Sequence, residues 1–145
     1  NVVKKMKEVN AVVGGEGGGG IIYPDLHYGR DALVGIALFL GLLVNKSIKV
    51  SNLRDSFPKY YMKKLKITLK DANLIDQVFE ELVSKYSNLS PNTEDGVRID
   101  FNEGWVHMRK SNTEPIVRIF SESDTQINAD KIAIDIKKEI NDLVN

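Results

Sequence analysis

Residues 97–121 read VRIDFNEGWVHMRKSNTEPIVRIFS and carry a clear pattern of β-strands. Apolar and polar side chains alternate over residues 97–101 and again over 105–109, a pattern typical of half-buried β-strands. Between them stands Asn102-Glu103-Gly104, where the glycine can supply the positive φ of a hairpin turn. Residues 116–121 have the composition of a third strand. The stretch therefore predicts three consecutive strands of an antiparallel sheet.

The segments on either side complete this unit. Residues 62–69 alternate as a further strand, and residues 71–86 place their apolar side chains along one helical stripe. A closing amphipathic helix is predicted over 127–144, with Ile132, Ile136 and Ile140 on one face. The order is βαβββα, which favours an antiparallel sheet with two helices on one face and an α+β fold class.

The first fifty residues follow a different pattern. Residues 11–13 (Ala-Val-Val) predict a short buried strand that leads into a glycine-rich run, and a long apolar helix begins near Asp31. The apolar run 32–44 is too short to span a bilayer, so it predicts a helix buried inside protein. One strand cannot bury such a helix, so we expect a partial α/β layer whose other strands come from outside these residues.

These patterns predict two domains. Residues 1–50 are interpreted as the C-terminal part of an α/β domain, and residues 62–145 as a complete second domain. Residues 51–61 are polar, contain a proline and show no sustained period, so they are interpreted as a linker.

Composition excludes several classes of function. The 145 residues contain 20 basic and 20 acidic side chains, so the formal net charge is zero. Binding of nucleic acid or of an anionic membrane surface needs a basic excess, so neither is expected as a partner. The chain has no cysteine, which excludes disulfides and thiolate metal sites and is compatible with a reducing compartment. Without a signal-peptide pattern at its start, the chain is expected to be cytoplasmic.

The loop between the second and third strands of the opening stretch carries many hydrogen-bond donors. It reads RKSNTEP over residues 109–115. Arg109 can donate two parallel bonds to a phosphate, while Ser111, Asn112 and Thr113 add hydroxyl and amide donors. Arg118 follows on the next strand and can reinforce the positive field. The alternative interpretation is an ordinary turn, since serine, asparagine and proline are common turn residues.

This loop resembles the R-P-S-[GN]-T-E-P-x-x-R signature of the α-D-phosphohexomutases, the phosphoglucomutase, phosphomannomutase and phosphoglucosamine mutase family. Only Lys110 departs from the signature, where the family has proline. The neighbouring segments 95–100 and Gly104-Trp105 are also similar to that family. The resemblance implies that Arg109, Ser111, Asn112 and Thr113 bind the phosphate group of the sugar that is not reacting.

The glycine run 14–20 is weak evidence by itself, because it lacks both dinucleotide-binding and P-loop spacing. It does resemble the G-E-x-S-G-H sugar-specificity loop of the third domain of the same family. Gly18 stands where that motif has serine, and Gly20 where it has histidine. The resemblance implies that Glu16, with Gly18, binds the sugar, Glu16 through the hydroxyls at positions 3 and 4.

Three other residues have competing interpretations. His27 can take the place of the missing loop histidine, although a surface or capping histidine is the favoured interpretation. Arg30 is either an anion contact or, preferably, a structural ion pair with Asp25 or Asp31. His107 alternates with Arg109 on one strand and is interpreted as structural.

The family resemblance also implies a mechanism in which a phosphoserine donates to a bisphosphorylated sugar intermediate, with Mg²⁺ holding the phosphoserine. The serine loop and the aspartate-rich metal loop that this needs do not occur in the 145 residues. The chain is therefore expected to bind a hexose phosphate together with missing N-terminal domains of the same polypeptide, and to hold no Mg²⁺ itself. The alternative is a free-standing sugar-phosphate-binding or regulatory module without catalysis.

Overall fold

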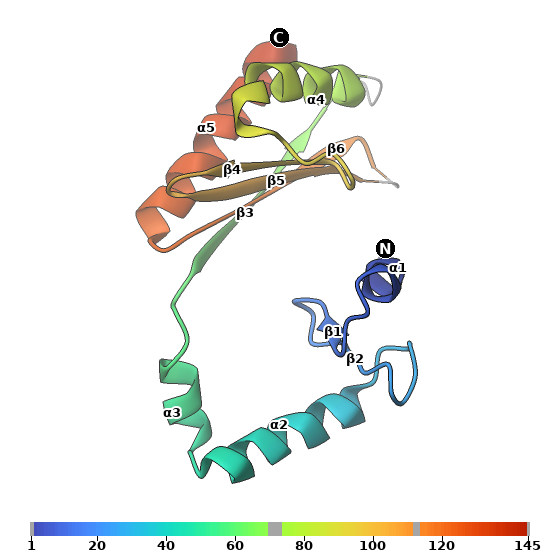
Figure 1. Cartoon of the computed structure of the whole chain (residues 1–145). Helices are drawn as coiled ribbons and strands as arrows, with labels where there is room; N and C mark the ends of the chain where they lie inside the picture. The colour runs from blue at the N-terminus through green and yellow to red at the C-terminus, as the bar shows by residue number, and fades with distance from the viewer. Residues whose placement is uncertain (1, 70–73, 112–113, 145) are drawn as a thin grey trace. The chain divides into compact units, whose positions relative to one another are not determined.

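The computed structural model describes residues 2–69, 74–111 and 114–144. The chain divides into two compact units, the first ending at Pro58 and the second beginning at Lys59. Figure 1 labels the helices and strands of both units.

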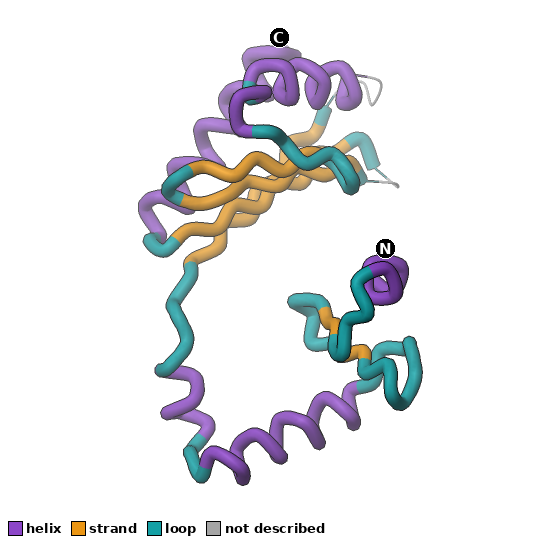
Figure 2. Tube along the Cα trace, viewed as in Figure 1, coloured by secondary structure: helices purple, strands orange, loops and turns teal. Residues whose placement is uncertain are grey.

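The second unit is built on a four-stranded antiparallel sheet in the order β3-β6-β5-β4. The strands are β3 (Tyr61–Thr68), β4 (Val97–Phe101), β5 (Gly104–Lys110) and β6 (Ile116–Ser123). Two helices cover it, α4 (Leu74–Lys85) and α5 (Gln126–Val144), and a short 3₁₀ turn, η1 (Ser87–Leu89), follows α4. Figure 2 shows both helices on the same side of the strands. The predicted βαβββα order and α+β class are confirmed.

One face of this sheet forms the core, as the alternation predicts. Ile99 pairs with Val106 across β4 and β5, and Met108 pairs with Ile119 across β5 and β6. These four side chains are fully buried, and the apolar stripes of α4 and α5 pack on them. The alternate residues of the strands lie on the opposite face, where charged side chains remain exposed.

Glycine is required at two turns of the sheet. Gly104 has φ 157°, and a Cβ atom there would overlap the backbone oxygen of Glu122 on β6. Gly96, which precedes β4, has φ 80°, and a Cβ atom there would overlap the backbone oxygen of Met108. The prediction that Gly104 provides the backbone conformation of the hairpin is confirmed, because side chains rarely adopt these φ values.

The first unit contains little regular sheet. Its elements are α1 (Val2–Glu8), β1 (Gly14–Gly15), β2 (Ile21–Ile22), α2 (Ala32–Lys46) and α3 (Val50–Asp55). The predicted strand at residues 11–13 is wrong: Val12 is 78% exposed, and the pairing is shifted to β1, which pairs antiparallel with β2. The chain reverses at the glycine loop, and this places residues 21–22 opposite residues 14–15, so the backbone hydrogen bonds form there and not at residues 11–13. Most of α3 lies within the stretch predicted as a linker.

Helix α2 begins where the sequence predicted but is not buried. Asp31 caps it by accepting hydrogen bonds from the backbone N–H of Leu33 at 2.8 Å and of Val34 at 3.1 Å. Within this chain no residue of α2 is buried and Leu33 is 77% exposed, so the predicted burial depends on cover from outside these residues. A helix that is apolar on all sides needs cover on all sides. The strands described in this unit are two residues each and cannot provide it.

Candidate functional site

The loop predicted to bind phosphate connects the end of β5 to the start of β6. Its base is closed by a hydrogen bond from the backbone N–H of Ser111 to the oxygen of Ile116, at 3.0 Å. The oxygen of Pro115 accepts a bond from the N–H of Leu69, at 2.9 Å, which ties the loop to the end of β3. Asn112 and Thr113, two of the four predicted phosphate ligands, lie outside the described residues. The structure thus places Arg109 and Ser111 at the entrance of a loop held by three strands.

Arg109 and Arg118 are direct cross-strand partners on β5 and β6. Both side chains are exposed on the sheet face opposite the core. Directly opposed residues of an antiparallel pair have their Cβ atoms about 5 Å apart, and like charges at that spacing repel each other. An anion between the two guanidinium groups would relieve this repulsion. The sequence indicated Arg118 as a cation that could reinforce the loop, and the strand register places it directly opposite Arg109.

Two carboxylates pair with basic side chains at the end of β5, one with Arg109 and one with Lys110. A nitrogen of the Arg109 guanidinium lies 3.0 Å from Asp95 Oδ2, and Lys110 Nζ lies 2.7 Å from Asp76 Oδ1. Gly96 allows the turn that carries Asp95 to approach the β5 backbone, and His107 Nε2 contacts the Asp95 backbone oxygen. This contact supports the structural interpretation of His107. Both ion pairs are about half exposed, so each contributes little to stability and can open for a ligand.

A pocket of about 730 Å³ lies beside α4 and the turn before β4. The two ion pairs, Arg109 with Asp95 and Lys110 with Asp76, border it. Phe79, Val83 and Val97 supply its apolar wall. Asp76 and Asp95 were not predicted as partners of the loop. The signal for Asp95 was its position before a glycine at the start of a strand, but nothing in the sequence linked Asp76 to Lys110, 34 residues away.

The glycine loop forms a tight reversal between β1 and β2. The N–H of Gly19 donates to the oxygen of Glu16 at 3.0 Å, and the N–H of Glu16 donates to the oxygen of Gly20 at 3.3 Å. Gly19 has φ 85°, which favours glycine at that position. A Cβ atom on Gly18 would meet nothing within 4 Å, so the loop is open at that point. The Glu16 carboxylate is therefore presented at the end of a short hairpin.

Arg30 contacts this loop, which corrects the expected pairing. Instead of Asp25 or Asp31, its Nη1 lies 3.3 Å from Glu16 Oε2. The sequence favoured the nearby carboxylates because they lie within five residues of Arg30. The fold brings Glu16, fourteen residues earlier, to the guanidinium.

His27 has the capping role that the sequence favoured. Its Nδ1 accepts a hydrogen bond from the N–H of Gly29 at 2.9 Å, which places the ring proton on Nε2. Nε2 lies 3.2 Å from Asp31 Oδ2. The hydrogen bonds that Asp31 accepts, above all from the N–H of Val34, hold the pKa of that carboxyl below its usual value. His27 thus supports the start of α2.

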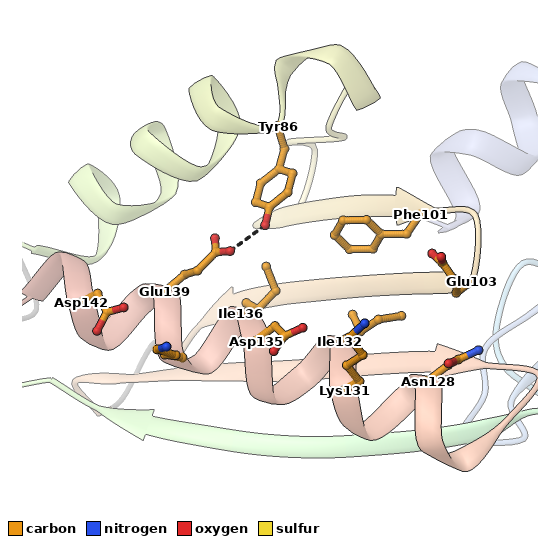
Figure 3. Close-up of a pocket in the computed structure, with 11 residues that line it drawn as sticks. Tyr86, Phe101, Glu103, Asn128, Lys131, Ile132, Asp135, Ile136, Glu139 and Asp142 are labelled. Carbon is orange, nitrogen blue, oxygen red and sulfur yellow. Dashed lines mark hydrogen bonds between the residues drawn. The ribbon is translucent and has the colours of Figure 1, made fainter.

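Another pocket, of about 500 Å³, lies between α5 and the end of β4 (Figure 3) and contains no residue of either loop. The Tyr86 hydroxyl donates to Glu139 Oε1 at 2.8 Å, and the Tyr86 ring meets Phe101 edge to face at 5.7 Å between centroids. Burial, with the Glu139 carboxylate, raises the pKa of Tyr86. These contacts join the 3₁₀ turn to α5 and have a structural role.

The described residues contain neither a metal-holding cluster nor a membrane-spanning helix. Within residues 2–69, 74–111 and 114–144, no group of three or more histidine, aspartate or glutamate side chains is arranged to hold a metal ion. Over the same ranges, no helix has both the length and the apolar character that a bilayer crossing requires.

Comparison with known proteins places both units in one family. Residues 49–139 match the model of the phosphoglucomutase/phosphomannomutase C-terminal domain, and residues 1–61 match that of its alpha/beta/alpha domain III. Among curated proteins, the phosphoglucosamine/phosphogalactosamine mutase of Sulfurisphaera tokodaii is 36% identical over 140 residues. The phosphoglucomutase/phosphomannomutase of Thermococcus kodakarensis is 39% identical over 129 residues. The matches cover 95% and 88% of this chain, but only 31% and 28% of those relatives.

Solved structures agree. A phosphoglucomutase/phosphomannomutase family protein from Burkholderia thailandensis matches with a TM-score of 0.76 and 25% identity, covering 97% of this chain and 30% of that one. An N-acetylphosphoglucosamine mutase from Aspergillus fumigatus, solved with GlcNAc-6P and magnesium, matches with a TM-score of 0.57. At 15% identity, over 81% of this chain and 22% of that one, it shows the fold alone. The chain therefore belongs to the phosphoglucomutase/phosphomannomutase family and corresponds to its C-terminal part.

Proposed function

We propose that this chain is the substrate-binding part of a longer phosphohexomutase that interconverts hexose 1-phosphates and hexose 6-phosphates. The observation that carries the proposal is the cross-strand pair of Arg109 and Arg118 beside the loop after β5, where the exposed ion pair of Arg109 with Asp95 can open for a phosphate group. The relatives named above are mutases of sugar phosphates, and this chain spans about 30% of their length. The remainder of the enzyme is thus proposed to lie outside these residues.

In this proposal the loop binds the phosphate group that does not react. Arg109 donates paired charge-assisted hydrogen bonds, and Ser111, Asn112 and Thr113 donate further bonds to the remaining phosphate oxygens. Arg118 adds positive charge from the neighbouring strand. Binding energy at a remote phosphate is useful because it can orient the reacting hydroxyl without being lost in the transition state.

The glycine loop is proposed to recognise the sugar. Glu16 is half exposed, and its carboxylate can accept hydrogen bonds from two vicinal hydroxyls. Gly18, with open space around it, leaves room for the sugar ring to approach the backbone. The similarity to a phosphoglucosamine/phosphogalactosamine mutase favours a hexosamine phosphate as one substrate.

The phosphoryl transfer itself is assigned to the rest of the enzyme. A phosphoserine would exchange its phosphoryl group with the sugar through a bisphosphorylated intermediate, and Mg²⁺ would neutralise the charge that develops during transfer. The residues described here do not fit a metal site, so the metal-assisted transfer is assigned to the rest of the enzyme and the chain alone is expected to be inactive. The absence of cysteine is consistent with a cytoplasmic enzyme.

The proposal is tested with the full-length protein and ³¹P NMR, which separates sugar 1-phosphates from sugar 6-phosphates. With Mg²⁺ and a trace of hexose 1,6-bisphosphate present, we expect conversion of glucosamine 6-phosphate, glucose 6-phosphate or mannose 6-phosphate into the 1-phosphate. If none of the three sugar phosphates is converted, the proposed activity is refuted. The 145-residue chain alone serves as the control that should show no conversion.

A further inference from the structure

The backbone of the first unit places Arg30 directly beside the glycine loop. The N–H of Asp31 donates to the oxygen of Ile21 at 2.7 Å, which fixes the residue before it next to β2. The Arg30 side chain then passes over Gly20, since a Cβ atom built on Gly20 would lie only 2.6 Å from Arg30 Cδ. Beyond Gly20 its guanidinium reaches the Glu16 carboxylate, at 3.3 Å.

The route of this side chain depends on the glycine at position 20. A larger residue there would occupy the volume that the aliphatic part of Arg30 now fills. The sugar loop that this segment resembles has histidine at that position. A histidine at 20 and Arg30 in its present conformation therefore exclude each other.

We propose that Arg30 is a positioning residue of the sugar loop, which holds Glu16 in place and replaces the histidine of the related motif. This inference rests on the proposed mutase function and adds a specific role within it. The guanidinium orients one carboxylate oxygen of Glu16 and leaves the other available to sugar hydroxyls. It keeps its charge throughout the pH range in which a histidine loses its own.

The exposure of the pair argues that its role is not stability. The side chains of Arg30 and Glu16 are 68% and 52% exposed. Ion pairs as exposed as this contribute little to the free energy of folding, because water and salt screen them. Loss of Arg30 should therefore change the binding of substrate much more than it changes the melting temperature.

The first test compares single variants of the full-length enzyme. Arg30→Ala should raise the KM for the hexose phosphate about 2- to 5-fold, the effect of losing one exposed ion pair that orients Glu16, with a smaller change in kcat. Arg30→Lys should recover part of this loss, and Arg54→Ala, on α3, is the matched control with the same change of charge. All variants should melt within a few degrees of the wild type.

The second test uses the exclusion between positions 20 and 30. Gly20→His should displace the guanidinium from Glu16, so adding Arg30→Ala to it should cost much less than Arg30→Ala alone. In the double variant, KM should become pH-dependent near pH 6.5, where an imidazole titrates, whereas the wild type lacks this step. The steric contact between positions 20 and 30 can by itself make the two substitutions non-additive, but it would not produce a pH-dependent KM.

The outcomes separate the two proposals. If the wild type is an active mutase and Arg30→Ala behaves like Arg54→Ala, the role of Arg30 is refuted and the mutase function stands. Additive effects of Gly20→His and Arg30→Ala would equally refute it. If the wild type neither converts nor binds any hexose phosphate, the mutase function fails and the role of Arg30 fails with it.

Discussion

Replacing Arg109 by alanine should weaken binding of the substrate by an amount that the ion pair with Asp95 limits. A hydrogen bond to a charged group contributes about 1.5–3 kcal/mol net. Substrate binding would break the ion pair that Arg109 makes with Asp95 at 3.0 Å, which reduces the net gain. Both side chains of this pair are about half exposed. A pair of that exposure is worth about 0.5 kcal/mol, so the net loss is about 1–2.5 kcal/mol. This corresponds to a factor of about 5 to 70 in kcat/KM.

The assay is the steady-state rate of the full-length enzyme with a hexose 6-phosphate, at fixed ionic strength because salt screens the effect. Arg98→Ala is the matched control, since Arg98 lies on β4 of the same sheet and pairs with Asp100 instead of the loop. We expect the control to change kcat/KM less than twofold. If Arg109→Ala is indistinguishable from Arg98→Ala, the assignment of the phosphate loop is wrong.

Three further predictions concern stability. Ser121→Ala should destabilise the second unit by about 1–3 kcal/mol in urea unfolding, because the buried hydroxyl donates to the Ala129 oxygen at 2.6 Å; an unchanged midpoint would contradict this. Gly96→Ala should lower the free energy of unfolding by more than about 1 kcal/mol, because φ is 80° there; a melting temperature equal to that of the wild type would be evidence against the strained turn. The hydrogen bond from the N–H of Val34 is the main cause that lowers the pKa of Asp31 in the folded chain. The stabilisation of α2 by the ionised cap should therefore be complete at pH values above the usual pKa of 3.8, and be lost as the pH falls through the lower pKa of the folded state. Asp31→Asn should remove this pH dependence of helix content in circular dichroism, and a persistent dependence would point to another group.

The second unit could be predicted because its information is local. Alternation over β4, β5 and β6 sets which side chains face the core, and Gly104 marks the hairpin turn. The helical stripe of α5 has the same origin, with Ile136 and Ile140 buried one turn apart. Each pattern is completed by partners inside the unit, so burial in the structure follows the sequence.

The first unit was harder to predict because its described residues do not cover its own apolar surfaces. The sequence of helix α2 predicts a buried helix, yet none of its side chains is buried among the described residues and most of its apolar ones are exposed. The apolar run at residues 11–13 likewise predicts a strand, yet only β1 and β2 find backbone partners. A hydrophobic pattern predicts that a helix or strand face is buried, but it does not identify the residues that pack against that face.

At the candidate site, residue types could be predicted but their ion pairs could not. Arg109 was identified from its loop, whereas its partner Asp95 depends on the turn at Gly96 and on the register of β4 and β5. Arg30 was assigned to the nearest carboxylates, while the fold delivers it to Glu16. Long side chains can reach several partners, and only tertiary structure selects among them.

Binding of phosphate by the loop after β5 can be measured by calorimetric titration of the full-length protein with hexose 6-phosphate and, separately, with inorganic phosphate. If the loop after β5 binds the phosphate group, Arg109→Ala should weaken both ligands. If Glu16 binds the sugar, Glu16→Gln should weaken the hexose phosphate and leave inorganic phosphate unchanged. Unaltered affinity of Arg109→Ala for both ligands would contradict the central claim.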